Sequence, residues 1–189
     1  MSFIRYSRGT TSIMLVVVVV VALAILVQDV QSMEERRAST RASKRLMNEL
    51  KGFHESDSYK NGVFTVELVD ENIFEWQVKI FKFDPESPLH KYLKKMKELG
   101  KGDDHFILHI SYPYNYPTSP PRVGIRYPVL GSRTNWSRTS NGHPVCVDLL
   151  EAGGWCSAYT IEPLILNLAT HLSNNIAYSR ELGYLKQDS

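Results

Sequence analysis

Cysteine is scarce in this chain, and the common metal-binding and nucleotide-binding motifs are absent. The 189 residues include two cysteines, Cys146 and Cys156, which excludes a disulfide-rich scaffold and a zinc site built from cysteines. There is no His-Glu-x-x-His motif, no P-loop and no glycine-rich dinucleotide fingerprint. We therefore expect no metal site and no cofactor.

An excess of charge of one sign is also lacking. Lys and Arg together number 22, Asp and Glu number 20, and the formal net charge is +2. This balance gives no support for a nucleic-acid partner, because nucleic-acid-binding domains carry a clear excess of basic residues. The length is typical of one domain with an appendage.

The appendage is a hydrophobic segment near the N-terminus. Residues 13–27 are fifteen consecutive apolar residues, and no charged residue occurs from position 9 to position 28. A helix of this uncharged length measures about 30 Å, the thickness of the hydrocarbon core of a bilayer. We expect membrane insertion of residues 10–28, within an anchor or signal segment 1–32, and a globular domain over residues 33–189.

Two fates of this segment stay open. It is either a retained anchor or a signal peptide cleaved near Val30–Ser32, and cleavage would release a lumenal or secreted protein with a glycosylation sequon at Asn135. Two basic residues precede the segment and five follow within about 20 residues. This asymmetry favours a single-pass protein with the domain in the cytosol, and the short valine-rich span suits the thin membrane of the endoplasmic reticulum or another endomembrane.

A polar linker and then a helix are predicted after the hydrophobic segment. Residues 28–37 are polar and charged, which favours the linker, and apolar residues then recur every three or four positions over residues 38–53. A basic stripe lies beside that apolar face of the helix. The basic stripe consists of Arg37, Arg41, Lys44 and Arg45.

Strict alternation of apolar and polar residues predicts four antiparallel strands, each with one buried face. The strands cover residues 64–68, 74–80, 106–112 and 123–127, with a turn at 70–72, a helical insert at 89–99, a proline-rich loop at 112–121, a long connection at 130–145 and a helix from Thr160. The predicted fold class is α+β: an N-terminal helix, a four-stranded antiparallel meander, a loop and a second helix packed on the sheet.

Cys146 ends the long polar connection, directly before an apolar turn. A lone cysteine is more often a small buried hydrophobic residue. Here a loop with Gly142 and Pro144 precedes it, and such a loop can present the sulfur to a partner as a nucleophile. Cys156, just before the second helix, is interpreted as structural.

Several segments together resemble the ubiquitin-conjugating enzymes. The proline-rich loop and strand at 112–123 are similar to those of the family, and the segment 141–150 is similar to its active-site cysteine segment. The segment 155–161 matches the tryptophan, loop and helix start that follow. The segments 73–79 and 84–89, with the lysine-rich insert, resemble the Q-type branch most closely.

This resemblance implies a fold and an activity for residues 33–189. The domain would be a catalytic domain of the UBC type, with Cys146 carrying ubiquitin as a thioester before transfer to a lysine. The partners would be ubiquitin, an activating enzyme that meets the basic stripe, and a ligase of unknown type. The ligase-facing loops would carry Tyr116, Thr118, Ser157 and Ala158.

Two departures from the family keep alternatives open. The His-Pro-Asn motif is missing upstream of the cysteine, and the candidates to replace its asparagine are Asn141, which we prefer, and Asn135. Thr118 stands where many members present a ligase-docking phenylalanine. The type of ligase therefore stays open. The missing motif, with a C-terminal part shorter than is usual in the family, makes a non-catalytic module that binds ubiquitin or a ligase the alternative to a working enzyme.

Overall fold

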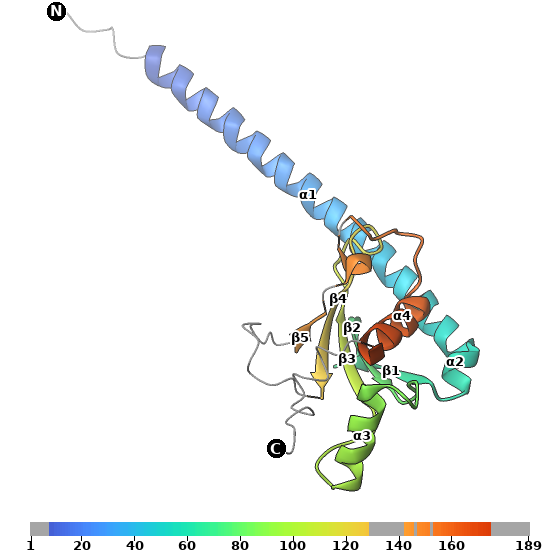
Figure 1. Cartoon of the computed structure of the whole chain (residues 1–189). Coiled ribbons are helices and arrows are strands. Elements are labelled where there is room, and N and C mark those ends of the chain that lie inside the picture. Colours follow the sequence, from blue (N-terminus) through green and yellow to red (C-terminus); the bar gives the residue numbers. More distant parts are fainter. Residues whose placement is uncertain (1–7, 129–141, 146, 152, 175–189) are drawn as a thin grey trace, which may run out of the picture.

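The computed structural model describes residues 8–128, 142–145, 147–151 and 153–174 (Figure 1). Helices pack on one face of an antiparallel sheet whose strand order is β1-β2-β3-β4-β5. The elements are α1 (Arg8–Glu55), α2 (Asp57–Lys60), β1 (Phe64–Val69), β2 (Asn72–Ile80), α3 (Pro88–Glu98), β3 (Phe106–Ser111), β4 (Arg122–Tyr127), β5 (His143–Pro144), the 3-10 helix η1 (Asp148–Leu150) and α4 (Ile161–Asn174). The α+β class and the four-stranded meander are confirmed.

Alternating residues of the first three strands form the core. The buried side chains on the helix-covered face are Phe64, Val66, Trp76, Val78, Ile80, Phe106, Leu108 and Ile110, each at most 7% exposed. Phe53 of α1 packs against this face, with its ring 5.6 Å from those of Phe64 and Trp76. The predicted second helix is confirmed as α4, which buries Ile165 and Leu168 completely.

The turn between β1 and β2 contains two residues in the left-handed conformation. Val69 pairs with Asn72 across the turn, so Asp70 and Glu71 are its two central residues. Their φ angles are 51° and 58°, which is the geometry of the mirror-image turns that match the twist of a hairpin. The predicted turn is confirmed at this position.

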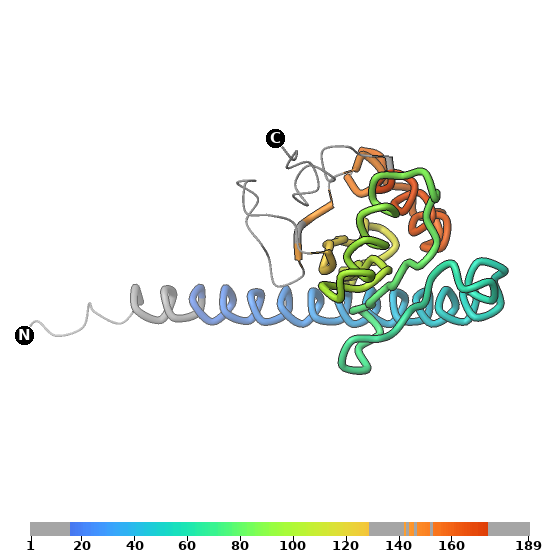
Figure 2. The backbone as a smooth tube through the Cα atoms, turned by 60° about the horizontal axis from the view of Figure 1, so that its bottom comes forward, coloured from blue at the N-terminus to red at the C-terminus, as the bar shows by residue number. Residues whose placement is uncertain are grey.

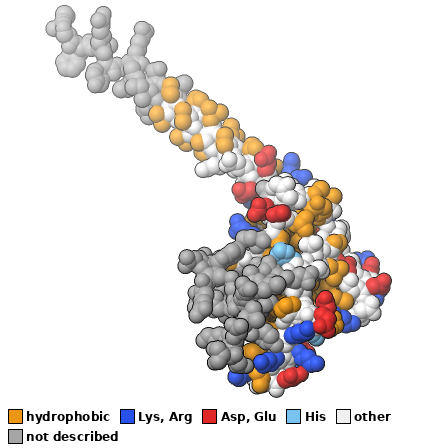
Figure 3. Space-filling model, in the orientation of Figure 1, with side chains coloured by type: hydrophobic (Ala, Val, Ile, Leu, Met, Phe, Trp, Pro, Cys, Tyr) orange, Lys and Arg blue, Asp and Glu red, His pale blue; other side chains and the backbone are white. Residues whose placement is uncertain are grey.

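Helix α1 is continuous from the apolar segment into the domain, and the linker predicted over residues 28–37 is wrong. Residues 10–51 contain neither glycine nor proline, so nothing in the backbone ends the helix there. The exposed part of α1 projects away from the sheet (Figure 2). Its side chains are apolar along the projecting helix and charged close to the domain (Figure 3). From Val16 onward, where the side chains of α1 are described, Ala42 is the first buried residue.

Candidate active site

Cys146 and Asn141 lie outside the described residues, but the chain on both sides of Cys146 is described. Val145 is buried, and its N–H donates a 2.9 Å hydrogen bond to the carbonyl of Val123 in β4. The carbonyl of Val147 accepts a 2.8 Å bond from the N–H of Leu150, which closes η1. The cysteine therefore falls between a residue tied to the sheet and a helical turn.

Two glycines bring the backbone close to its neighbours on either side of this segment. Gly142 has a φ of 99°, and a Cβ there would collide with the carbonyl oxygen of Ile125. A Cβ at Gly154 would collide with the carbonyl oxygen of Asp148. Both positions require glycine, because a side chain would push the segment away from β4 or open the loop after η1.

The proline-rich loop is bonded to the loop that follows η1. Trp155 donates a 2.8 Å hydrogen bond from Nε1 to the carbonyl of Pro117, and its ring lies 6.1 Å from that of Tyr116. Thr118 is exposed on the first loop, and Ser157 and Ala158 are exposed on the second. These two loops form one surface at the same end of the domain.

Tyr116 faces the interior rather than this surface. Its side chain is 1% exposed, and its hydroxyl donates a 2.7 Å hydrogen bond to Oε1 of Glu49 on α1. Burial, together with the charge of Glu49, raises the pKa of Tyr116 above its usual value. Tyr116 therefore stays a protonated donor and holds the proline-rich loop against the helix.

Glu49 joins three segments that are far apart in the sequence. Besides Tyr116, its carboxylate accepts a 2.6 Å bond from Nε of Arg45 and a 2.8 Å bond from the N–H of Ile161, the first residue of α4. The side chain of Glu49 is 6% exposed, so this carboxylate is buried and paired. It binds α1, the proline-rich loop and the start of α4 together.

Arg45 completes this network from the basic stripe. Its Nη2 donates a 2.8 Å hydrogen bond to the carbonyl of Tyr159, in the loop before α4. Burial lowers the pKa of Arg45, but the hydrogen bond and negative charge of Glu49 outweigh that effect and raise the pKa. The other members of the stripe, Arg37, Arg41 and Lys44, are exposed along α1.

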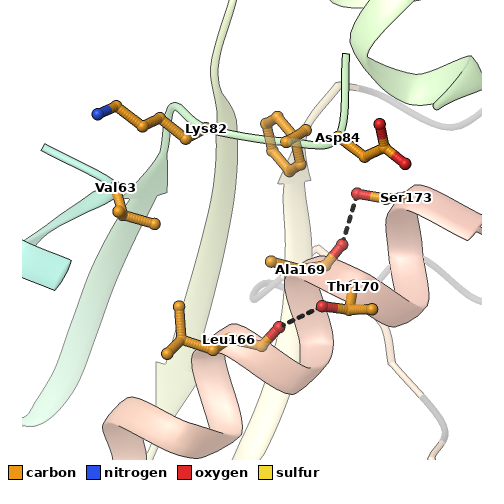
Figure 4. A pocket seen from close by; sticks show the side chains of 8 residues that line it. Val63, Lys82, Asp84, Leu166, Ala169, Thr170 and Ser173 are labelled. Carbon is orange, nitrogen blue, oxygen red and sulfur yellow. Dashed lines mark hydrogen bonds between the residues drawn. The ribbon is translucent and has the colours of Figure 1, made fainter. Parts of the chain in front are cut away.

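A groove at the far end of α4 offers no chemistry of this kind. It encloses about 390 Å³ between α4 and the segment 82–84 (Figure 4). The hydroxyls of Thr170 and Ser173 donate to carbonyls within α4. Among the described residues, no group of three or more His, Cys, Asp or Glu side chains could hold a metal ion.

Comparison with known proteins agrees with the resemblance found in the sequence. The chain is 38% identical to human ubiquitin-conjugating enzyme E2 Q1 over 134 residues, which are 71% of this chain and 31% of that protein. It is 36% identical to ubiquitin-conjugating enzyme E2 25 of Caenorhabditis elegans over 137 residues, which are 72% of this chain and 34% of that protein. Among solved structures, human ubiquitin-conjugating enzyme E2 G1 matches 68% of this chain and 92% of its own, with a TM-score of 0.48 and 21% identity.

The chain is a homologue of the Q-type ubiquitin-conjugating enzymes. It spans about a third of the length of the two relatives compared by sequence. No protein-family model matches it.

Glu49 is a residue of this site that the sequence did not indicate. Its partners Tyr116 and Ile161 are more than 60 residues away, so no local pattern could identify the network. One local signal was available, because Arg45 and Glu49 are four residues apart on a predicted helix, the spacing of an intrahelical ion pair.

Proposed function

We propose that this chain is a ubiquitin-conjugating enzyme that carries ubiquitin as a thioester on Cys146 and transfers it to a substrate lysine. The observation that supports this most strongly is the homology to the Q-type enzymes together with a cysteine between Val145 and η1. Both neighbours of this cysteine are bonded within the domain, as a fixed nucleophile requires.

The chemistry needs no group beyond these residues and the partner proteins. The thiolate of Cys146 attacks the thioester carbonyl of ubiquitin on the activating enzyme, whose own cysteine leaves as a thiolate. A lysine amine then attacks the new thioester carbonyl, the C–S bond breaks and an isopeptide bond forms. The amine proton goes to solvent, and Cys146 is restored.

The thioester is tested with the full chain in lipid nanodiscs, supplied with activating enzyme, ATP and ubiquitin. We expect an adduct that a thiol reductant removes, none with Cys146→Ala, and a reductant-stable ester with Cys146→Ser. Cys156 is exposed and therefore accessible to the activating enzyme, so it is the matched control. Cys156→Ser should keep charging. A folded preparation that never forms the adduct would instead favour the non-catalytic binding module.

The oxyanion of the transfer step needs a donor, and we assign this role to Asn141 in place of the missing asparagine. Asn141→Ala should leave charging intact and slow discharge to free lysine by about 10²-fold. Equal discharge rates would remove Asn141 from this role.

The surfaces of the domain divide between two partners in this proposal. Arg37, Arg41 and Lys44 are exposed and can meet an acidic surface of the activating enzyme, while Arg45 contributes through its bond to Glu49. Thr118, Ser157 and Ala158 present the ligase-facing surface, which Tyr116 supports from inside.

The apolar part of α1 anchors the enzyme, with the domain in the cytosol where ATP and ubiquitin are available. The described segment Val16–Glu55 is long and apolar enough to cross a membrane. In cells, we expect membrane retention after carbonate, digestion of the domain by protease added to intact microsomes, and no shift with glycosidase. A glycosylated, protected domain would contradict this orientation.

A further inference from the structure

The part of α1 between the apolar run and the domain is a helix with no described neighbour along most of its length. The fourteen residues from Gln28 to Arg41 are exposed or half-buried, and the first buried residue is Ala42. Hydroxyls of Ser32 and Thr40 donate to carbonyls one turn earlier, as they do in a regular helix. Fourteen helical residues measure about 21 Å.

Both ends of this exposed helix are fixed when the protein is in a membrane. The apolar run holds one end in the bilayer, and Ala42 and Leu46, both completely buried, hold the other in the core. A helix without glycine or proline over residues 10–51 has no point at which to bend sharply. The domain is therefore held at a set height above the bilayer rather than tethered loosely.

The contacts of α1 also determine which end of the domain faces the membrane. Arg45 and Glu49, near the point where α1 enters the domain, bond to Tyr159, Tyr116 and the start of α4. Phe53, further from the membrane, contacts β1 and β2. Figure 1 shows η1 and the loop before α4 at the end of the domain from which α1 leaves.

From Gln28 to Arg45 the helix rises about 26 Å, and to Glu49 about 32 Å. Lipid headgroups occupy about 5–8 Å of that height. A tilt of about 20°, the average for membrane helices, shortens it by only about 6%. The ligase-facing loops and η1 therefore face the bilayer, and a water layer of about 20–25 Å separates them from the lipid headgroups.

We infer that α1 is a rigid spacer that selects substrates: it directs ubiquitin to lysines of membrane-bound proteins that lie within about 30 Å of the bilayer. This inference rests on the proposed function. A lysine more than about 30 Å from the bilayer lies beside or beyond the domain, on the side away from η1. A lysine of a soluble protein is not concentrated near the thioester and reacts no faster than any other amine in solution.

The test uses the full chain and single-span acceptor proteins in the same vesicles. Each acceptor carries one lysine on a rigid helical extension, at about 10, 25 or 60 Å from the bilayer. With activating enzyme, ATP and ubiquitin, we expect transfer at 25 Å to exceed transfer at 60 Å by about 10-fold, the effect of a higher effective concentration. Equal transfer at all three heights would overturn the inference.

Two insertions of equal length between Met33 and Glu34 distinguish the effect of the height of the domain above the bilayer from the effect of helix rigidity. Seven helix-forming residues add about 10 Å and nearly two full turns, so the domain keeps its direction. The preferred height should move outward by the same amount. Seven Gly and Ser residues should abolish the preference. An unchanged profile with the helical insertion would overturn the spacer.

Discharge to free lysine in solution is the internal control, because a small amine reaches the thioester at any height. It should be equal in the wild type and in both insertion variants, which also shows that the domain is folded. If no variant forms the thioester or discharges to free lysine, the proposed function fails and the inference fails with it. If free lysine is modified without height preference, only the inference fails.

Discussion

Helix α1 has a projecting half, residues 8–41, and a packed half, residues 42–55. The described apolar side chains of the projecting half point away from the protein, whereas those of the packed half lie in its core. Large apolar side chains from Val16 to Val27 are 49–63% exposed, whereas Ala42, Leu46 and Phe53 are at most 2% exposed. The packed half has the amphipathic spacing of a helix that covers a sheet. Within the projecting half, residues 16–27 are apolar on all sides and rich in β-branched valine, which is a weak helix former in water. In the membrane arrangement that we propose, lipid covers this half as the sheet covers the packed half.

The largest expected effect comes from placing charge in the projecting half. Val18→Arg with Val21→Arg puts two charges near the centre of the apolar run, at about 2.5–3.5 kcal/mol each, or about 5–7 kcal/mol in total. We expect the protein to leave the membrane pellet on carbonate extraction. Val18→Leu with Val21→Leu is the control and should stay in the pellet. Retention of the arginine variant would mean that lipid does not surround this half.

In the packed half, two adjacent residues allow a direct comparison of inside and outside. Leu46 is completely buried and Met47 is 61% exposed. Leu46→Ala should lower the free energy of unfolding by about 2–5 kcal/mol, because it leaves a cavity, and Met47→Ala by less than about 0.5 kcal/mol. Urea unfolding in nanodiscs, followed by tryptophan fluorescence, measures both. Equal midpoints would contradict the packing described.

Removing the carboxylate of Glu49 tests the polar part of the same half. Glu49→Ala leaves the hydroxyl of Tyr116, the N–H of Ile161 and the side chain of Arg45 without this acceptor, at a cost of about 3 kcal/mol. Glu49→Gln keeps an acceptor oxygen and should lose less. Urea midpoints rank the variants, and a Gln variant as unstable as the Ala variant would show that the charge itself is required.

The smallest effect is expected at the boundary between the halves. Thr40 is exposed, and alanine is the better helix former by about 0.5 kcal/mol. If α1 folds continuously into the domain, Thr40→Ala should raise the urea midpoint slightly. An unchanged midpoint would indicate that α1 is frayed at Thr40 and does not fold continuously into the domain.

The strands and α4 could be predicted because their signal is local. The buried face of each element is predicted by its own residues, without reference to the rest of the chain. The evidence is the alternation over 64–68 and 74–80 and the apolar spacing after Thr160. β5 could not be found this way. It is a two-residue strand that exists because His143 and Pro144 pair with Ile125 and Gly124, some 20 residues earlier.

The continuity of α1 was missed for a different reason. Residues 28–37 are polar and charged, which is typical of linkers, but Glu, Arg, Met and Ala are also good helix formers. Composition alone does not separate a solvated helix from a linker. The absence of glycine and proline over residues 10–51 was the better signal. The roles of Cys146 and Asn141 came from the family resemblance and remain proposals.

The β1–β2 turn shows that this fold has not reached its most stable sequence. Asp70 and Glu71 are exposed, and both adopt a conformation that costs a non-glycine residue about 1–2 kcal/mol. Asn-Gly would fit the same turn with little strain. Proteins are selected to exceed a stability threshold, not to maximise stability. Glu71→Gly should therefore raise the free energy of unfolding. This gain would offset destabilising substitutions elsewhere and make the domain more tolerant of mutation.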